Sequence, residues 1–471
     1  MRKLSVAAVS LVLVASSCMD GGGGDQRTVL VDFSHDEFAS FMVANFPDAV
    51  SVTPGTELVF KQTWTGEPHT VTGGALVNEM MEKGKPFMDL FAGFEALQAS
   101  GADLPEGGEQ PDLPVEEFFD AVDAADNEEA KRQLYSGYDA LREQGLDLPD
   151  RENPGDATNA DLDRIIGEEA DKFFEDTGVP WAFDETEDGD GFVTQNAGQP
   201  CYLTRGGPPK DADAACRDAQ QQQPAFDGTH SYYNSGIIPY EGPQGNTFRV
   251  PLADDIEPGG YFFYCAVHGP AQSTEVTVRP EGSDVPSQED ISRQAREEIA
   301  RFSEPMQEVY NDARDGEIDM RGETLEGPFA GLSVPVHGSI NEFVPKELTA
   351  KVGEEVTWKI MGADHTITFD VPEYFPIIQF AENGRVALNP RLQEPAGGAP
   401  ELPEQEGEGP QEGEGPVEID GGTYDGDGFW SSGLTSAEPF LAYTLRFSRP
   451  GTYRYACLLH PPMVGSVEVT R

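Results

Sequence analysis

Short runs of alternating apolar and polar residues occur near both ends of the chain. Residues 49–53 and 57–64 form two such runs, and Pro54-Gly55 separates them. Residues 451–456 and 466–470 show the same pattern near the C-terminus. Alternation with a period of two, interrupted by turn residues, predicts half-buried β-strands. The pattern therefore predicts a mainly β protein.

A block with a different periodicity interrupts the first β region. In residues 76–81, 86–97, 115–146 and 160–177 the apolar positions recur at spacings of three and four, which is typical of helices. Prolines at positions 105 and 149 separate the later segments. Phe87, Phe91 and Phe94 form an aromatic stripe, which predicts the core of a small helical bundle inserted between strands. A ligand pocket lined by Phe and Met side chains remains the alternative.

The two halves of the chain contain the same motifs in the same order. Residues 63–64 and 357–358 are both Thr-Trp, and each pair leads through a Gly-bearing turn to a His-Thr-(Val/Ile)-Thr segment. A Cys-x-x-His segment follows much later in each half. The shared histidines and cysteines are His69, Cys265 and His268 in the first half and His365, Cys457 and His460 in the second. Repetition of this kind predicts two related modules in tandem.

These residue types predict a metal centre in each module. Met463 follows His460 by three residues, and thiolate, imidazole and thioether ligands together suit copper. In the first module Gln272 precedes the closing strand residue Val276 by four, as Met463 precedes Val467. Glutamine is an accepted axial ligand in copper sites of this kind.

Two alternatives remain open. In the second module a buried cysteine and methionine could belong to an ordinary core, with histidines nearby by chance. In the first module Gln272 could face solvent, which would leave a three-coordinate site that holds copper poorly.

The motifs resemble those of the cupredoxins, the blue copper proteins that include plastocyanin and azurin. His365, the loop 457–463 and the strand-like segment 341–358 carry the resemblance. It implies two Greek-key β-sandwich domains, the first with the helical insertion. It further implies one type 1 copper site with His365, Cys457 and His460 in the trigonal plane and Met463 as the long axial ligand. A second site would use His69, Cys265, His268 and Gln272.

The resemblance also implies an electron port. In the family, the histidine of the last loop emerges through an apolar surface patch, and His460 is expected to do so here. The surrounding patch would consist of Leu458, Leu459, Pro461, Pro462 and Val464. Around His268 only Ala266, Val267, Pro270 and Ala271 are available.

The N-terminus has the features of an export signal. A positive start is followed by an apolar run at residues 4–14, which is too short to span a bilayer, and by a small-residue cleavage site. Because this site ends on Cys18, it resembles a bacterial lipoprotein signal with a lipid anchor on Cys18; ordinary secretory cleavage is the alternative. Either way we expect an exported protein, at the cell surface or in the periplasm. In an oxidising compartment Cys201 and Cys216 could form a disulfide, with reduced buried thiols as the alternative.

The expected organisation is as follows. Residues 1–18 are a signal peptide, 19–26 a Gly-rich tether, and 27–280 the first cupredoxin-like domain with its helical insertion at about 76–178. Residues 281–326 are a linker containing a helix from Gln288 to Ala313. Residues 327–471 are the second domain, with an acidic low-complexity loop at about 394–417.

The net charge restricts the classes of partner that the protein could bind. The 31 basic against 85 acidic residues give a formal net charge of −54, which argues against nucleic-acid partners. The acidity fits either the attraction of cationic redox proteins or solubility in a salty milieu; the oligomeric state is not indicated.

We expect an electron carrier that cycles between Cu(I) and Cu(II), not an enzyme. Multicopper oxidases and nitrite reductases need additional His-x-His ligands, and the sequence contains no His-x-His. A copper-holding or surface-binding scaffold without redox turnover is the alternative. Because glutamine oxygen is a harder ligand than thioether, the second site is expected to be the better electron acceptor.

Overall fold

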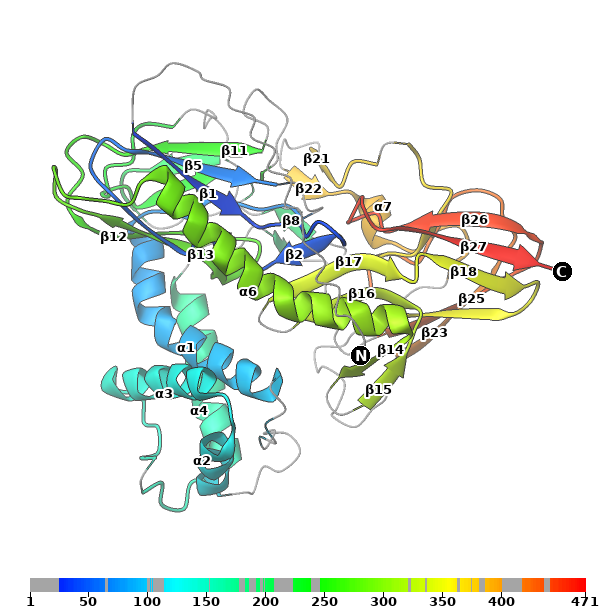
Figure 1. Cartoon of the computed structure of the whole chain (residues 1–471), viewed down its shortest axis with the longest axis horizontal. Helices are drawn as coiled ribbons and strands as arrows, with labels where there is room; N and C mark the ends of the chain where they lie inside the picture. The colour runs from blue at the N-terminus through cyan, green and yellow to red at the C-terminus, as the bar shows by residue number, and fades with distance from the viewer. Residues whose placement is uncertain are drawn as a thin grey trace, which may run out of the picture.

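The computed structural model describes residues 25–63, 67–99, 102, 104, 114–151, 153–177, 183–185, 192–194, 198, 200–206, 223–238, 246–320, 323–334, 337–361, 365–373, 375–380, 386–399, 417–435 and 441–471. Within these residues the chain is mainly β, with two regions of large sheets and a separate group of helices (Figure 1). The prediction of a mainly β protein with a helical insertion is confirmed.

The first β region consists of a four-stranded sheet, β11-β5-β1-β3, and a six-stranded sheet, β4-β13-β12-β6-β10-β9. The strands are β1 (Gln26–Val31), β3 (Asn45–Phe46), β4 (Ala49–Val52), β5 (Glu57–Gln62), β6 (Thr72–Gly73), β9 (Pro200–Leu203), β10 (Tyr232–Ser235), β11 (Thr247–Pro251), β12 (Gly259–Cys265) and β13 (Gly269–Val278). The alternation in the sequence sets the core, because every second residue of β1, including Val29 and Val31, is buried and packs with residues such as Phe60 and Val276.

The second β region also has two sheets, β2-β17-β16-β19-β25-β23 and β18-β27-β26-β20-β24. Besides β2, the strands are β16 (Phe329–Val334), β17 (Gly338–Val344), β18 (Glu347–Lys351), β19 (Glu355–Ile360), β20 (Thr368–Phe369), β23 (Val417–Tyr424), β24 (Trp430–Ser431), β25 (Leu441–Phe447), β26 (Gly451–Ala456) and β27 (Val464–Thr470). Trp358 is fully buried at the centre of this core and donates from Nε1 to the Tyr455 hydroxyl over 3.2 Å.

One strand joins the two regions. Strand β2 (Ser40–Met42) comes from the N-terminal part of the chain but pairs antiparallel with β17 at the edge of the second region, with Phe41 opposite Ser339. The predicted limits of the two domains remain predictions. The pairing shows that the N-terminal segment contributes to both regions, so the two are connected by backbone hydrogen bonds as well as by side chains.

Helix α6 (Gln288–Asp315) also connects the two regions and runs along both in Figure 1. It begins at the capping box of Ser287 and Asp290 and ends at Gly316, which has a φ of +110°. Its buried Met306 packs in one cluster with Phe46 from the first region and Phe329 from the second. The predicted helix of the linker is therefore present, and it packs against both β regions.

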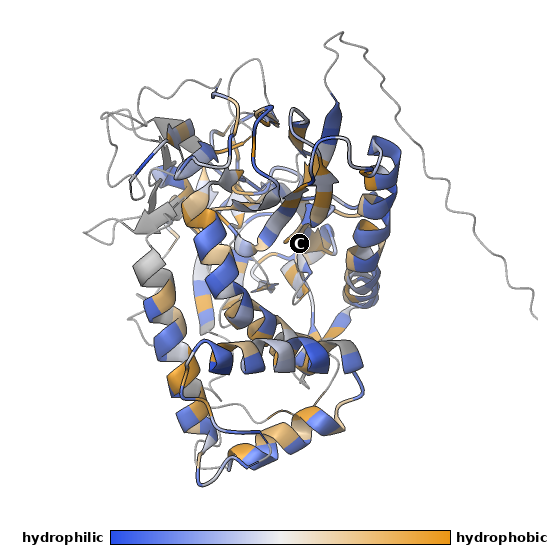
Figure 2. Cartoon of the chain, turned by 90° about the vertical axis from the view of Figure 1, so that its left-hand side faces the viewer, coloured by the Kyte–Doolittle hydropathy of each residue, from blue (hydrophilic) through white to orange (hydrophobic). Residues whose placement is uncertain are grey.

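The inserted helices are α1 (Ala75–Ala99), α2 (Val115–Ala124), α3 (Glu128–Glu143) and α4 (Asn159–Thr177). Pro86 lies inside α1, so the first two predicted helical segments form one helix. Figure 2 shows polar and apolar residues on different sides of these helices. Phe87 is buried in their core and Phe94 packs against it, but the prediction for Phe91 was wrong, because this side chain is 40% exposed.

The remaining elements are small. Strands β14 (Glu317–Met320) and β15 (Glu323–Glu326) form a hairpin, and α7 (Pro390–Gln393) is a single turn. A four-stranded sheet combines β7 (Phe183–Glu185), β8 (Phe192–Thr194), β21 (Ile378–Phe380) and β22 (Val386–Leu388).

Several predictions fall outside the described residues. These are the signal peptide with Cys18, most of the tether, Cys216 and residues 400–416 of the acidic loop. Cys201 is in a disulfide, but its pairing with Cys216 remains a prediction. Among the described residues, no helix combines the length and apolar character needed to cross a membrane.

Candidate metal centres

Three side chains of the second region converge although 95 residues separate the first from the last. The Nδ1 atoms of His365 and His460 are 3.0 Å apart, and the Cys457 sulfur lies 4.0 Å from the former and 3.5 Å from the latter. All three residues are buried, and their ligand atoms form a compact group. We refer to this group, together with Met463, as centre 2.

Backbone contacts fix centre 2 at the end of one sheet. His365 exchanges both backbone hydrogen bonds with Thr435 just before β20, and Cys457 directly follows β26. The turn after Cys457 is closed by a hydrogen bond from the Met463 amide to the His460 carbonyl over 2.8 Å. Met463 has no exposed surface and packs in the same hydrophobic cluster as Cys457, and its role as the axial ligand remains a prediction.

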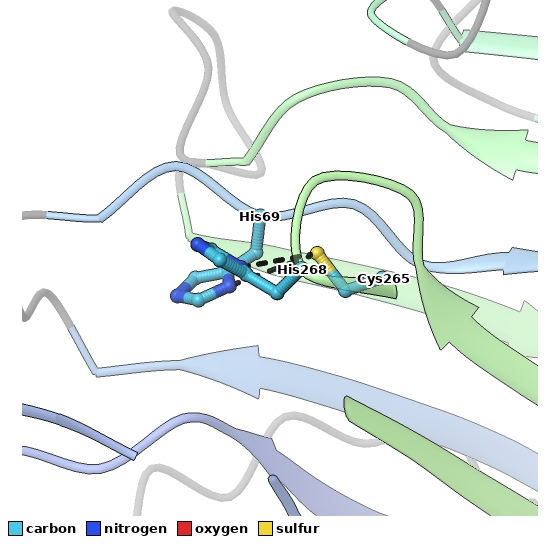
Figure 3. Close-up of side chains that lie close together, drawn as sticks. All are labelled: His69, Cys265 and His268. Atoms are coloured by element: carbon cyan, nitrogen blue, oxygen red, sulfur yellow. Dashed lines mark hydrogen bonds between the residues drawn. The ribbon is translucent and has the colours of Figure 1, made fainter. Parts of the chain in front are cut away.

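The first region contains a matching group, which we call centre 1. The Cys265 sulfur lies 3.8 Å from Nδ1 of His69 and 3.5 Å from Nδ1 of His268 (Figure 3). Gln272 on β13 directs Oε1 to within 3.0 Å of the His69 Nδ1 and 3.1 Å of the His268 Nδ1. Gln272 is fully buried, so the alternative in which it faces solvent is wrong.

The repeated His-Thr-x-Thr segment has the same structural role at both centres. At centre 1 the Thr70 amide donates to the Cys265 sulfur over 3.3 Å, and Thr70 Oγ1 accepts from the Ala266 amide over 2.7 Å. At centre 2 Thr366 makes the corresponding contacts with the sulfur of Cys457 and the amide of Leu458, over 3.4 and 2.8 Å. The threonine therefore ties the histidine segment to the cysteine loop in both regions.

The ligand atoms fit a single metal ion at each centre. First-row metals in proteins bind histidine nitrogen at about 2.0–2.1 Å and thiolate at about 2.3 Å. Two ligand atoms of one ion can therefore be separated by about 4.1–4.4 Å at most. Every nitrogen–nitrogen and nitrogen–sulfur distance above meets this limit. A thiolate and two imidazoles with a weak additional ligand are the set that suits copper.

The charges at the centres favour the ligand forms. Burial raises the pKa of the Cys457 thiol, but the two histidines of centre 2 together lower it more, so this pKa lies well below its usual range. The pKa of Cys265 is lowered in the same way by the two histidines of centre 1. Burial lowers the pKa of His268, but Cys265 and Glu67 raise it to about 10. Both cysteines are therefore disposed to be thiolates, the form that binds a metal.

His69 and His365 are the upstream histidines of the two centres. Their Nε2 atoms, on the side of the ring away from the metal-binding nitrogen, have different surroundings. His69 Nε2 lies 3.2 Å from Oδ2 of the fully buried Asp32. Burial lowers the pKa of His69, but the Asp32 hydrogen bond and Cys265 raise it above its usual value. Among the described residues, His365 Nε2 is buried and has no hydrogen-bond partner. The first ring is thus oriented by a carboxylate and the second is not.

The expected electron port at His460 is wrong. The His460 ring has no exposed surface, and its Nε2 contacts the carboxylate of Glu67, a residue of the first region. Leu458 is also buried, whereas Val464 is 51% exposed. The His460 ring is therefore covered by a residue of the other half of this chain, although Pro461, Pro462 and Val464 of the same loop are exposed.

Three residues near the centres were not predicted from the sequence: Asp32, Glu67 and Phe41. The Phe41 ring packs on the His268 ring with their centroids 4.4 Å apart. None of the three belongs to a repeated motif, and Phe41 arrives through the pairing of β2 with the second region. Only the position of Glu67, two residues before His69, gave a signal in the sequence.

Comparison with known proteins gives partial similarity to cupredoxins. No protein-family model and no curated protein matches this chain. A reduced amicyanin variant is 22% identical over 27% of this chain and 72% of its own, with a TM-score of 0.14. Oxidised plastocyanin from Dryopteris crassirhizoma is 20% identical over 30% and 97% of the two chains, with a TM-score of 0.16. A purple cupredoxin from Nitrosopumilus maritimus is 18% identical over 28% and 83%, with a TM-score of 0.14. Because these scores are low, the assignment of the two centres rests on their own geometry.

Proposed function

We propose that this protein is an exported single-electron carrier with a type 1 copper ion at each centre. The observation that carries the proposal is the convergence of two histidine Nδ1 atoms and one cysteine sulfur, twice in one chain, at distances that suit one ion. His365, Cys457 and His460 would hold the ion at centre 2, with Met463 as the axial ligand. His69, Cys265 and His268 would hold the ion at centre 1, with Gln272 as the axial ligand.

Copper would supply the Cu(I)/Cu(II) couple, and the surrounding residues supply a ligand set that suits both states. Amide groups of Thr70 and Val267 donate to the Cys265 sulfur over 3.3 and 3.4 Å, which favours the thiolate. The ligand residues are anchored to strand ends, which limits their movement when the charge changes. Burial keeps water from the sulfur and from both imidazoles of centre 2.

An electron carrier fits these features better than an enzyme. Within the described residues, the groups of histidine, cysteine and acidic side chains that could hold a metal are the two centres themselves. Partner proteins are proposed to be redox proteins, with cationic surfaces that match the net charge of −54. The protein is proposed to reach them at the cell surface or in the periplasm, anchored through a lipid on Cys18.

Metal analysis and spectroscopy of the full chain test this function. The wild-type protein is expected to bind two copper ions and to become intensely blue on oxidation, with paramagnetic signals from two type 1 sites. Cys265→Ser and Cys457→Ser should each retain one copper ion and the spectrum of the other site. A copper-loaded protein that stays colourless would instead support the scaffold without redox turnover.

A further inference from the structure

The carboxylate of Glu67 lies between the two centres. Its Oε1 contacts Nε2 of His460 at hydrogen-bonding distance, and its Oε2 lies 3.9 Å from Nε2 of His268. Glu67 is only 5% exposed. A single buried acidic group therefore contacts one loop histidine of each centre on the side away from the metal-binding nitrogen.

Both β regions hold Glu67 in this position. Its backbone carbonyl accepts from Gln62 Nε2 over 2.5 Å within the first region, and Asn341 of β17 donates to its Oε1 over 3.3 Å from the second. Phe41 covers the nearby ring of His268, and β2, which carries Phe41, is paired with β17. The carboxylate is thus fixed at the seam between the regions.

These contacts form a short connection between the two sulfur atoms. Each loop histidine directs Nδ1 to its own cysteine, 3.5 Å away in both centres, and Nε2 to the same carboxylate. The connection runs from Cys265 through His268, Glu67 and His460 to Cys457. At His460 this connection does not contact solvent, because the His460 side chain is fully buried.

We propose that Glu67 couples the two centres, so that electrons pass between them inside the molecule through His268, the Glu67 carboxylate and His460. This inference rests on the proposed function, because it needs copper at both centres. One electron moves in each event: the ion held by Cys265 is oxidised from Cu(I) to Cu(II), and the ion held by Cys457 is reduced from Cu(II) to Cu(I). Charge balances without a proton or a third reactant.

The carboxylate has two physical effects in this arrangement. By accepting the Nε2–H of His460, and by facing Nε2 of His268 at ion-pair distance, it favours the tautomers that leave the Nδ1 lone pairs available for the metal. As a buried negative charge next to both ligand sets, it also stabilises Cu(II) at both centres. A residue that only stabilised the fold would have neither effect.

The test compares three variants of the full copper-loaded chain. Glu67→Gln keeps the shape and removes the charge, whereas Glu67→Asp keeps the charge and shortens the reach. Glu342→Gln is the matched control, because Glu342 is a buried carboxylate of β17 that accepts from the Ala39 amide over 3.0 Å and lies at the same seam. Its side chain contacts Ala39, Tyr310 and Lys346, none of which belongs to a metal centre.

Two measurements separate the outcomes: the reduction potential of each centre, and the rate of electron equilibration between centres after rapid photochemical reduction of one. Glu67→Gln should shift the Cu(I)/Cu(II) equilibrium of both centres about tenfold towards Cu(I), which is about 59 mV for a one-electron couple. It should also slow equilibration about tenfold or more, as expected when a charge-assisted contact is lost. Glu67→Asp should slow equilibration with a smaller change in potentials, and Glu342→Gln should match the wild type in both.

The possible negative results differ in meaning. If wild-type protein binds copper at both centres but Glu67→Gln equilibrates at the wild-type rate, the coupling is wrong and the carrier function stands. The same holds if Glu342→Gln slows the transfer equally. If the wild-type chain does not form two blue copper sites, both the function and the coupling are wrong.

Discussion

Gly331 lies directly against the ring of His365. A Cβ atom on Gly331 would be 1.9 Å from the His365 Nε2, far inside van der Waals contact. Gly331 also has a φ of +75° and sits at the irregularity of the β16–β17 pairing, between Ala330 and Leu332. The ring that has no hydrogen-bond partner at Nε2 among the described residues is therefore held by close backbone contact.

Gly331→Ala is expected to disrupt centre 2. The left-handed conformation costs an alanine about 1–2 kcal/mol, and the forced displacement of the buried His365 ring adds about 1–3 kcal/mol. Copper content should fall from two ions to one, with the spectrum of centre 1 retained, and the thermal midpoint of the metal-free protein should fall.

Gly353→Ala is the matched control for this change. Gly353 has a φ of +79°, and nothing lies within 4 Å of the position of its Cβ. This variant should show the conformational cost alone and keep both copper ions. Equal losses of stability in the two variants, with copper retained in both, would contradict the packing role of Gly331.

The position of Gly331 in the second region corresponds to that of Asp32 in the first. Leu30 pairs with Phe46, which precedes Pro47, and Phe329 pairs with Val344, which precedes Pro345. Two residues after Leu30 and Phe329 come Asp32, with a φ of 64°, and Gly331. The same backbone position thus carries a carboxylate beside the upstream histidine at centre 1 and a glycine packed closely against the upstream histidine at centre 2.

Asp32→Asn is expected to raise the reduction potential of centre 1 alone. The change removes a buried negative charge 3.2 Å from the His69 ring, while asparagine tolerates the positive φ. Loss of one charge-assisted hydrogen bond should favour Cu(I) about tenfold or more, which is about 59 mV for a one-electron couple. A redox titration that resolves the two centres measures this shift. An equal shift at centre 2 would show that the effect is not local.

Gln272→Met is expected to raise the reduction potential of centre 1 and so bring it closer to that of centre 2. The Gln272 oxygen lies 3.0 and 3.1 Å from the two Nδ1 atoms, so it is placed to stabilise Cu(II) as a hard ligand. The reciprocal variant, Met463→Gln, should lower the potential of centre 2. Redox titrations that give equal potentials in the wild type, or no shift in Gln272→Met, would contradict the assignment of Gln272 as the axial ligand.

Local sequence patterns could predict which histidines and cysteines converge in each half of the chain. His69 and Cys265 are 196 residues apart, yet the Thr-Trp, His-Thr-x-Thr and Cys-x-x-His segments occur in the same order in both halves. The His-Thr-x-Thr and Cys-x-x-His segments contact each other in the same way in both halves, as the paired contacts of Thr70 and Thr366 show. A strand end and a tight turn are enough to place such ligands, so the pattern is readable without knowledge of the rest of the fold.

The relation between the two centres could not be predicted in this way. Glu67 contacts His460 across 393 residues, and β2 pairs with a strand about 300 residues away. Neither contact depends on a periodic pattern, because both arise from the packing of one β region on the other. The expectation of an exposed His460 failed for the same reason: it treated the second region as an isolated domain.

The pair of His460 and Glu67 predicts how the stability of the metal-free protein depends on pH. Burial lowers the pKa of His460, but Glu67 and Cys457 raise it to about 10. Burial raises the pKa of Glu67, but His460 and His268 hold it well below its usual value of 4.5. A raised histidine pKa contributes stability that is complete below the unfolded value of 6.5 and is lost as the pH rises towards 10. A lowered carboxyl pKa contributes stability that is complete above 4.5 and is lost in more acidic solution.

Both contributions are therefore complete only between pH 4.5 and 6.5. Over this interval the thermal midpoint of the metal-free wild type should exceed that of Glu67→Gln by the largest margin. The margin should shrink in acid, where Glu67 takes up a proton, and in alkali, where His460 loses one. Thermal unfolding of both proteins in the presence of a chelator, repeated across the pH range, measures the margin directly. A margin that grew steadily with pH would mean that His460 is not the charged partner of the Glu67 carboxylate. If it were, the loss of the His460 proton in alkali would reduce the margin.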